Sequence, residues 1–274
     1  MPGDFIKGII GDGYLTEIIL TAFMRQIKIT PDDTYVLAKT SGRCQELLEQ
    51  YNVHAVQNPM IFVPPAQLII LACELEESDE LMKEIAHKMA RDVLIISVVP
   101  NLKLSAIEKY FKNNMVIRLI MNPWVVSGYG VSTYIVGSNR QEESKNIARA
   151  ILTSLGETIE VESEDELEIV GDLILSETVY SFLTVKSLVG SGKKAGVSLD
   201  KSKEIVMKIL SSSIKAIAES DEVTETVMKR SYNQSNYVEK GKELLEKYQI
   251  VENFKQSFEA RLEEKEIFKL RYRW

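Results

Sequence analysis

The sequence predicts an α/β fold in which a doubly wound parallel sheet is followed by an all-helical domain. Short apolar runs alternate with amphipathic helical segments up to about residue 162. Some of these runs, such as Leu68 to Ala72, are apolar at every position, which is typical of parallel strands covered on both faces. Alternating strands and helices favour a parallel sheet. After residue 162 only helical periodicity remains, so we expect one domain over residues 1-162 and a second over residues 163-274.

The elements of the first domain follow from the apolar pattern and the turn residues between the runs. Strands are expected at Phe5 to Ile10, Thr34 to Ala38, Val53 to Val56, Gln67 to Cys73, Val93 to Val98, Val116 to Ile120, Gly130 to Val136 and Thr158 to Val161. Helices are expected from about Leu15 to Phe23, Arg43 to Tyr51, Ser78 to Met89, Ser105 to Phe111 and Glu142 to Leu155.

The second domain is predicted to contain only helices. The acidic run that begins at Ser163 suits a helix N-terminus, where negative charge is favourable, and Ser198 can cap a further helix. The predicted helices are Leu167 to Leu188, Leu199 to Glu219, Val223 to Lys229, Val238 to Tyr248 and Val251 to Phe268. The segment Gly190 to Lys194 resembles a phosphate loop but lacks the preceding strand, so we interpret it as a turn between helices.

Composition narrows the class of protein. The formal net charge of -7 gives no basic excess of the kind that nucleic-acid binding requires. The only cysteines, Cys44 and Cys73, do not form a metal-ligand spacing, and their small number indicates a reducing compartment. There is no secretory signal pattern and no stretch that approaches the roughly 18 apolar residues of a membrane helix. We therefore expect a cytoplasmic protein without a bound metal, nucleic acid or membrane.

The most informative motif is the glycine-rich turn between the first predicted strand and the first predicted helix. It reads Gly11-x-Gly13-x-x-Thr16, with Asp12 inside it. Gly11 permits a tight turn, and Gly13 lets backbone N–H groups approach a pyrophosphate at the helix N-terminus. Because the motif lies at the first strand–helix junction, it favours a Rossmann-type dinucleotide-binding domain over a plain glycine-rich turn.

The end of the second predicted strand discriminates between cofactors. NAD enzymes usually place an Asp or Glu here, on the ribose 2′-hydroxyl. The segment Ala38 to Arg43 contains no acid but has two cations, Lys39 and Arg43, and two hydroxyls. This composition suits a 2′-phosphate and predicts NADP. The alternative is that both cations are merely solvated.

Short motifs in a fixed order resemble the pyrroline-5-carboxylate reductase family over almost the whole chain. Gly8 to Thr16 is similar to the opening G-x-I-G-x-G-N-M-A of that family, Leu71 to Leu75 stands in place of its L-A-V-K-P, and Val116 to Trp124 is similar to its V-x-R-x-M-P-N-T-P. The cofactor residues that the resemblance and the turn imply are Gly11, Asp12, Gly13, Tyr14, Leu15, Lys39, Arg43, Asn58, Ala72 and Cys73.

The sequence departs from the family mainly in the two segments that correspond to the family's catalytic and substrate-binding motifs. The family's S-G-S-G-P-A-Y corresponds to Ile174 to Tyr180, where Ser176 and Tyr180 remain, and its S-P-G-G-T-T corresponds to Ser231 to Asn236 without either glycine. In the family, this loop holds the substrate carboxylate beside the nicotinamide. The resemblance implies that the catalytic residues are Ser176 and Asn236, and that the substrate-binding residues are Asn122, Ser231, Asn233, Gln234 and Ser235.

These observations favour an NADP-dependent reductase that transfers hydride to a small cyclic imine. Two alternatives stay open, a non-catalytic NADP-binding regulatory protein and a reductase for a different imine or keto substrate. In the family the helical half forms an interlocked dimer, and the apolar helical stripes after residue 167 also indicate a homodimer or a higher homo-oligomer.

Overall fold

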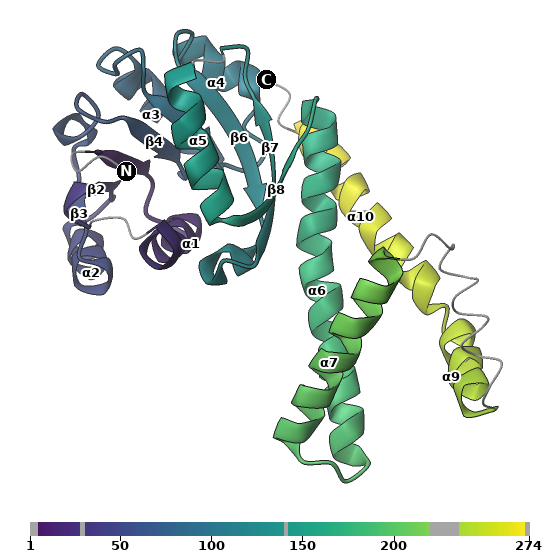
Figure 1. Ribbon diagram of the computed structural model, residues 1–274. Helices are drawn as coiled ribbons and strands as arrows, with labels where there is room; N and C mark the ends of the chain where they lie inside the picture. Colours follow the sequence, from purple (N-terminus) through teal and green to yellow (C-terminus); the bar gives the residue numbers. More distant parts are fainter. Residues whose placement is uncertain (1–4, 28–30, 140–141, 220–235, 272–274) are drawn as a thin grey trace. The chain divides into compact units, whose positions relative to one another are not determined.

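The computed structural model describes residues 5–27, 31–139, 142–219 and 236–271. Within these ranges the chain forms two compact units, residues 1–175 and residues 176–274. The first contains a single sheet flanked by helices, and the second contains only helices (Figure 1). This confirms the predicted fold class. The expected domain boundary at residue 162 follows the end of the sheet and stays a prediction.

The sheet has the strand order β3-β2-β1-β4-β5-β6-β7-β8. Its strands are β1 (Lys7–Ile10), β2 (Thr34–Leu37), β3 (His54–Val56), β4 (Leu68–Leu71), β5 (Leu94–Ser97), β6 (Met115–Met121), β7 (Gly130–Val136) and β8 (Gly156–Glu160). The central strands β1, β4 and β5 are buried at every position, as their continuous apolar runs predict. The order reverses direction beside β1, so the carboxyl ends of β1 and β4 border the crevice where ligands bind in doubly wound sheets.

One strand pair departs from the predicted parallel arrangement, because β7 runs antiparallel to β6. The two strands are joined by a short connection through the 3₁₀ segment η4 (Pro123–Ser127). A connection this short joins antiparallel neighbours, whereas a parallel pair needs a crossover of a dozen or more residues. The strand β8 then pairs parallel to β7, after the intervening helix α5 (Glu142–Ser154).

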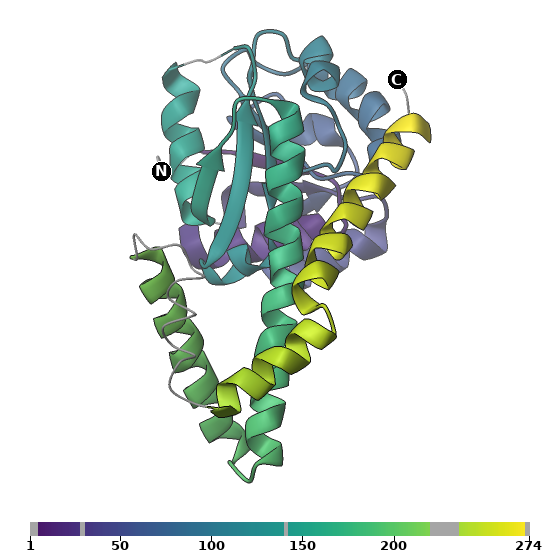
Figure 2. The ribbon, with the colours of Figure 1, turned by 90° about the vertical axis from the view of Figure 1, so that its right-hand side faces the viewer.

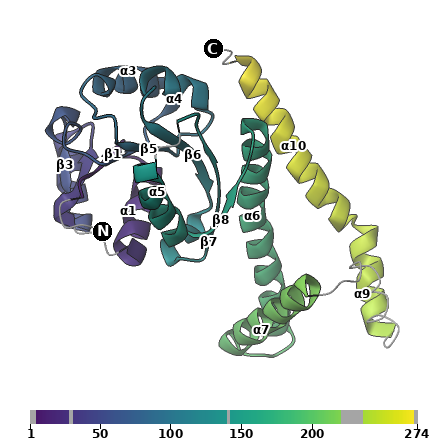
Figure 3. The same cartoon turned by 45° about the horizontal axis from the view of Figure 1, so that its top comes forward.

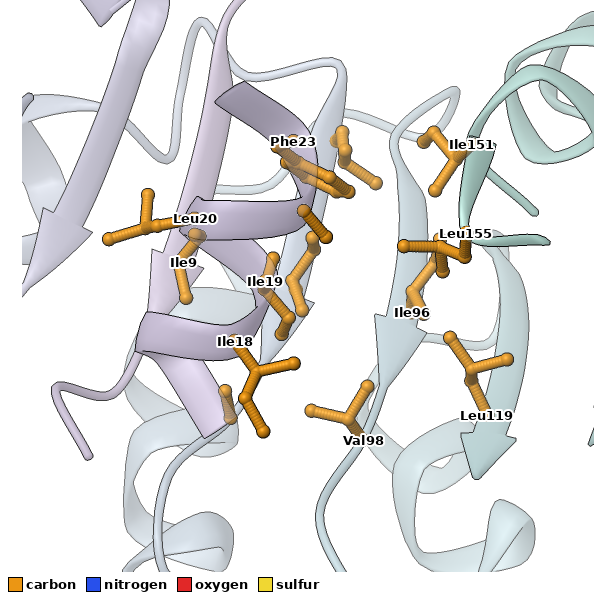
Figure 4. Packing of buried hydrophobic residues seen from close by; sticks show 14 of the residues in the cluster. Ile9, Ile18, Ile19, Leu20, Phe23, Ile96, Val98, Leu119, Ile151 and Leu155 are labelled. Carbon is orange, nitrogen blue, oxygen red and sulfur yellow. The ribbon is translucent and has the colours of Figure 1, made fainter. Parts of the chain in front are cut away.

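Helices cover both faces of the sheet. The helices of the first unit are α1 (Tyr14–Ala22), α2 (Ser41–Tyr51), α3 (Leu75–Ala86), α4 (Leu104–Tyr110) and α5. The helices α3 and α4 lie on one side of the sheet, and α1 and α5 lie on the other (Figure 3). Figure 4 shows the second of these interfaces, where Ile18 and Ile19 of α1 and Ile151 of α5 lie beside the strand residues Ile9 and Ile96.

The long helix α6 (Glu164–Lys194) begins on the sheet, where Leu167 packs with Ile135 of β7 and Val161. Gly171 lies so close to Ile120 that a Cβ there would be 2.6 Å from the Ile120 side chain. The first turns of α6 therefore belong to the core of the first unit.

The second unit consists of the rest of α6 with α7 (Leu199–Ala218), α9 (Asn236–Lys247) and α10 (Ile250–Arg271) (Figures 1 and 2). Ser198 caps α7 by accepting a hydrogen bond from Lys201 N, as predicted. Where α10 crosses α6, the Tyr180 hydroxyl donates to the Phe254 carbonyl and the two rings lie 4.8 Å apart. The helix predicted at Val223 to Lys229 lies outside the described residues.

The turn predicted at Gly190 to Lys194 is wrong, since these residues continue α6. The helix ends at Lys194, and just beyond it Gly196 adopts a positive φ of 94° and Val197 N donates back to the Gly192 carbonyl. Gly196 is thus the glycine that stops the helix, while Gly192 is needed for packing, because a Cβ there would be 2.7 Å from Ser202 Oγ of α7.

Among the described helices, α6 contains an 18-residue window whose mean hydropathy of 1.2 would allow it to cross a membrane, judged by length and composition alone. The sequence expectation of no such stretch missed it, because serine, threonine and glycine interrupt the apolar residues. Only 17% of this window is buried within the chain. An exposed apolar helix face is also what a helix–helix interface requires.

Candidate functional site

The glycine-rich turn connects β1 to α1 at the centre of the sheet. Gly11 has a φ of +130°, and a Cβ at this position would lie 2.4 Å from the Ala72 carbonyl oxygen at the end of β4. The turn therefore requires glycine twice over, for its backbone conformation and for its close approach to β4. This confirms that a tight turn requires glycine at position 11, as predicted.

Gly13 leaves space at the N-terminus of α1. It stands at the N-cap and has no side chain to accept hydrogen bonds from the first helical turn. Among the described residues, the nearest atom to a Cβ built on Gly13 would be Glu74 Oε1, at 3.8 Å. Backbone N–H groups at an open helix N-terminus fit a pyrophosphate. Tyr14 and Leu15 form the first turn of the same helix, with Tyr14 68% exposed.

Thr16 occupies the third position of the motif, which is usually a smaller residue, and its side chain forms a hydrogen bond within the turn. Its side chain is fully buried, and its hydroxyl donates a 2.9 Å hydrogen bond to the Gly11 carbonyl. The hydroxyl thereby satisfies a backbone group that the sharp turn removes from the β ladder. Threonine at this position stabilises the turn without entering the space above it.

Asp12 braces the turn against the loop between β2 and α2, because its carboxylate and its carbonyl group both contact that loop and the start of α2. Its Oδ2 accepts a 2.8 Å hydrogen bond from Lys39 N. Its carbonyl oxygen accepts two hydrogen bonds from Arg43, from Nε at 3.1 Å and from Nη2 at 3.0 Å. The carboxylate in the turn is therefore compatible with an anionic ligand.

Both cations at the end of β2 have carboxylate partners. Lys39 Nζ lies 2.5 Å from Glu77 Oε1 of α3, and this hydrogen bond raises the pKa of Lys39. Arg43 pairs with Glu17 of α1 and, at 2.9 Å, with Glu46 of α2. The Lys39 side chain is 56% exposed, and exposed ion pairs of this kind contribute only about 0–1 kcal/mol. An anionic ligand can therefore open the Lys39 pair.

A cleft of about 390 Å³ lies between the ends of β1, β2 and β4 and the helix α3. Its lining comprises Gly11, Leu37, Ala38, Lys39, Gln57, Cys73, Glu77, Glu80, Leu81 and Glu84. The cleft thus brings the predicted residues Gly11, Lys39 and Cys73 together. Burial raises the pKa of the Cys73 thiol to about 11, so this cysteine is a neutral part of the wall at physiological pH.

Four polar residues of the cleft were not anticipated from the sequence, namely Gln57, Glu77, Glu80 and Glu84. The three glutamates share one face of α3, at positions i, i+3 and i+7. That spacing is visible in the sequence, but only the fold shows that the face is turned toward Lys39. Gln57 donates through Nε2 to the Lys39 carbonyl and helps to fix this loop.

Two further predicted residues, Asn58 and Asn122, each accept a hydrogen bond from a backbone N–H group. Asn58 is exposed and accepts through Oδ1 from Met60 N, which caps the 3₁₀ segment η3 (Pro59–Ile61). Asn122 is buried, and its Oδ1 accepts a 3.2 Å hydrogen bond from Val131 N. It holds η4 against β7, and η4 in turn packs against α1.

The predicted catalytic residues belong to the second unit. Ser176 is 3% exposed, and its Oγ has no hydrogen-bond partner among the described residues. Asn236 is the first residue of α9. The predicted substrate residues Ser231, Asn233, Gln234 and Ser235 lie outside the described residues. In the described part of the chain, no group of three or more His, Cys, Asp or Glu side chains is placed to hold a metal ion.

Comparison with known proteins agrees with this geometry. A family model described as NADP oxidoreductase, coenzyme F420-dependent, matches residues 7–101, which include the glycine-rich turn and the cleft. Pyrroline-5-carboxylate reductase 2 of Bacillus subtilis is 24% identical over 244 residues, covering 85% of this chain and 84% of that protein.

Solved structures show the same fold. A pyrroline-5-carboxylate reductase from Coxiella burnetii superimposes with a TM-score of 0.73 and 20% identity over 94% of this chain and 96% of that one. A Plasmodium falciparum pyrroline carboxylate reductase with NADP bound gives a TM-score of 0.79 at 18% identity, over 95% and 97% of the two chains.

The fold and the glycine-rich turn define a nucleotide-binding oxidoreductase of the NAD(P)-dependent class. Within this class the chain is similar to the pyrroline-5-carboxylate reductases, as its motifs predicted.

Proposed function

We propose that this protein is an NADP(H)-dependent reductase that converts a small cyclic imine bearing a carboxylate into the corresponding amine. The observation that carries the proposal is the open N-terminus of α1 behind Gly13, at the edge of a cleft that contains Lys39. The relatives named pyrroline-5-carboxylate reductase support the substrate class. The bound dinucleotide supplies the hydride.

The residues of the first unit would bind and orient the cofactor. Gly11 and Gly13 would leave room for the pyrophosphate, and the N–H groups of Tyr14 and Leu15, in the first turn of α1, would donate to it. Lys39 and Arg43 are the cations available to a 2′-phosphate. The Ala72–Cys73 segment at the end of β4 and Asn58 after β3 would border the rest of the cofactor.

The substrate residues would be Ser176, Asn122 and the segment that contains Ser231, Asn233, Gln234, Ser235 and Asn236. The buried Ser176 hydroxyl can donate to a ligand, since no described residue takes its hydrogen bond. If the imine binds already protonated, hydride addition to its carbon yields the neutral amine, and no side chain has to deliver a proton. The protein would then act by orientation, carboxylate binding and exclusion of water.

The altered substrate segment predicts slow turnover of pyrroline-5-carboxylate. Replacing two family glycines with Asn233 and Gln234 removes close backbone approach to a carboxylate. Each lost charged hydrogen bond can cost about 1.5–3 kcal/mol, and about 1.4 kcal/mol is a tenfold change in rate. We therefore propose a preference for a cyclic imine other than pyrroline-5-carboxylate, or a weak activity on it.

The protein would act in the cytoplasm as a homodimer or a higher homo-oligomer, with a small-molecule substrate and no nucleic-acid or membrane partner. The exposed apolar face of α6 would then be covered by another subunit. This assignment rests on the family resemblance and on the net charge of -7.

NADPH oxidation with pyrroline-5-carboxylate and a panel of five- and six-membered cyclic imines tests the proposal. We expect turnover of at least one imine. We expect this protein to reduce pyrroline-5-carboxylate about a hundredfold more slowly than an ordinary pyrroline-5-carboxylate reductase does. Turnover of none of them by a protein that binds NADPH would refute the reductase. An ordinary rate with pyrroline-5-carboxylate would show that the replaced glycines are harmless.

A further inference from the structure

Lys39 is the residue of this cleft on which cofactor choice depends. It stands at the end of β2, where a doubly wound sheet presents a side chain to the 2′ position of the adenosine ribose. Its Nζ, however, lies 2.5 Å from Glu77 Oε1, and its backbone N–H is taken by Asp12. A 2′-phosphate must therefore compete for the ammonium group with a carboxylate that comes from the other side of the cleft.

Arg43 cannot replace Lys39 in this role without losing more contacts. Its guanidinium donates to the Asp12 carbonyl through Nε and Nη2, and it pairs with Glu17 and Glu46. The side chain is 22% exposed, against 56% for Lys39. Arg43 is thus engaged in bracing the glycine-rich turn, and Lys39 is the cation that is free to move.

The negative charge of the cleft also disfavours binding of a 2′-phosphate. Glu77, Glu80 and Glu84 line it from α3, and among the described residues Lys39 is the only cation in its lining. A phosphate monoester carries about -1.5 to -2 charges at pH 7. It meets carboxylates on the α3 side of the cleft, whereas a 2′-hydroxyl can donate a hydrogen bond to one of them.

We propose that Glu77 is a specificity-determining residue that competes with the 2′-phosphate of the cofactor for Lys39. The inference rests on the proposed function, because it takes this cleft as the adenosine side of the dinucleotide site. A cofactor without the phosphate binds with the Lys39–Glu77 pair intact. A cofactor with the phosphate binds only after the pair has opened, so Glu77 reduces the preference for NADPH that Lys39 alone would give.

The test is calorimetric titration of Glu77→Gln and the unaltered protein with NADPH, NADH, adenosine 2′,5′-bisphosphate and 5′-AMP. The last two probe the adenosine end without any catalysis. We expect Glu77→Gln to lower the Kd for NADPH and for the bisphosphate about fivefold, the upper range for an exposed ion pair. The Kd values for NADH and 5′-AMP should change by less than about twofold.

Glu80→Gln is the matched control. It removes the same charge from the same cleft, but no described residue forms an ion pair with Glu80, whereas Glu77 pairs with Lys39. If it raises the NADPH preference as much as Glu77→Gln does, general repulsion accounts for the effect and the competition for Lys39 is refuted. A second test combines the changes, since in Lys39→Ala the Glu77→Gln effect on NADPH should fall to less than half.

The outcomes separate this inference from the function on which it rests. If the unaltered protein binds neither NADPH nor NADH, the proposed function is refuted together with the inference. If it binds both and Glu77→Gln leaves the ratio of their Kd values unchanged, the reductase proposal stands and the role of Glu77 is refuted.

Discussion

Gly11 shows how one residue ties a sequence motif to the position of a ligand. Its φ of +130° and its contact with the Ala72 carbonyl leave no room for a side chain. We expect Gly11→Ala to destabilise the protein by about 1–3 kcal/mol, since residues forced into such backbone regions carry strain of this order. Urea denaturation followed by circular dichroism measures the change.

Gly42 provides the control for that substitution. It lies in the first turn of α2, and a Cβ there would have no neighbour within 4 Å. Gly42→Ala should leave stability unchanged or raise it by about 0.4–1 kcal/mol. A loss at Gly42 equal to that at Gly11 would contradict the steric argument.

The buried thiol of Cys73 should make the stability of the folded protein depend on pH. Burial raises its pKa from the ordinary value of 9.0 to about 11 in the folded protein. The folded state therefore favours the neutral thiol, and the resulting stability is complete below pH 9 and is lost as the pH rises through 11. We expect roughly 2 kcal/mol to be lost between pH 8 and pH 11.

The measurement is the free energy of unfolding against pH for the protein and for Cys73→Ala. Ionisation of all other groups is common to both proteins, so their difference isolates the thiol. The gap between the two curves should shrink by roughly 2 kcal/mol toward pH 11. A constant gap would mean that the Cys73 thiol ionises in the folded state as it does in the unfolded chain.

Some residues of the site could be predicted from the sequence and others could not. The glycines and Lys39 were predicted because their roles depend on local backbone geometry and on position after a strand. Glu77 was missed because it lies 38 positions from Lys39 in the sequence. Its role arises only when α3 packs beside the end of β2, and no local pattern encodes that distance.

At the scale of elements, one buried arginine adds ion pairs to the apolar packing that attaches α6 to the sheet. Arg118 of β6 is 4% exposed in its side chain and pairs with Glu164 at 2.5 Å and with Glu168 at 2.7 Å. Glu164 also accepts from Leu104 N, at the start of α4. These contacts hold the first two turns of α6 against β6 and the end of α4.

We expect the double variant Glu164→Gln, Glu168→Gln to lose about 3 kcal/mol of stability, because it leaves the buried Arg118 charge without a counter-ion. Urea denaturation measures this loss. Adding Arg118→Met should restore most of it, since replacing a whole buried ion cluster is often neutral. A triple variant no more stable than the double one would show that shape, not charge, is what the cluster provides.

The elements themselves were largely predictable, and the errors have local causes. The strand β7 has the predicted bounds, but its antiparallel direction depends on the short connection through η4 rather than on its own apolar pattern. The end of α6 was misplaced because Gly190 and Gly192 look like turn residues, whereas only Gly196 has the positive φ that ends the helix.

At the scale of the molecule, the two units differ in how they bury apolar residues. The sheet unit hides its core on both faces of the strands. The described helices of the second unit leave many large apolar side chains exposed, including Phe182, Leu183, Ile209, Ile214 and Ile217. Helical periodicity predicted these stripes, but it could not say whether a neighbouring helix of the same chain covers them.

We expect a second subunit to cover the apolar stripe on α7, so that charged substitutions in this stripe disrupt the oligomer. Ile214 and Ile217 are 65% and 49% exposed within one chain. If they lie in a subunit interface, Ile214→Lys together with Ile217→Lys places two charges in an apolar contact and should dissociate the oligomer, because charged residues are depleted at interface cores. We expect light scattering to give at least twice the 31.0 kDa of one chain for the unaltered protein and about one chain mass for the variant. Lys203→Asp, at an exposed polar position of the same helix, should leave the assembly intact. An unaltered protein that is monomeric at micromolar concentration, or a double variant that assembles normally, would show that this face of α7 is not an interface.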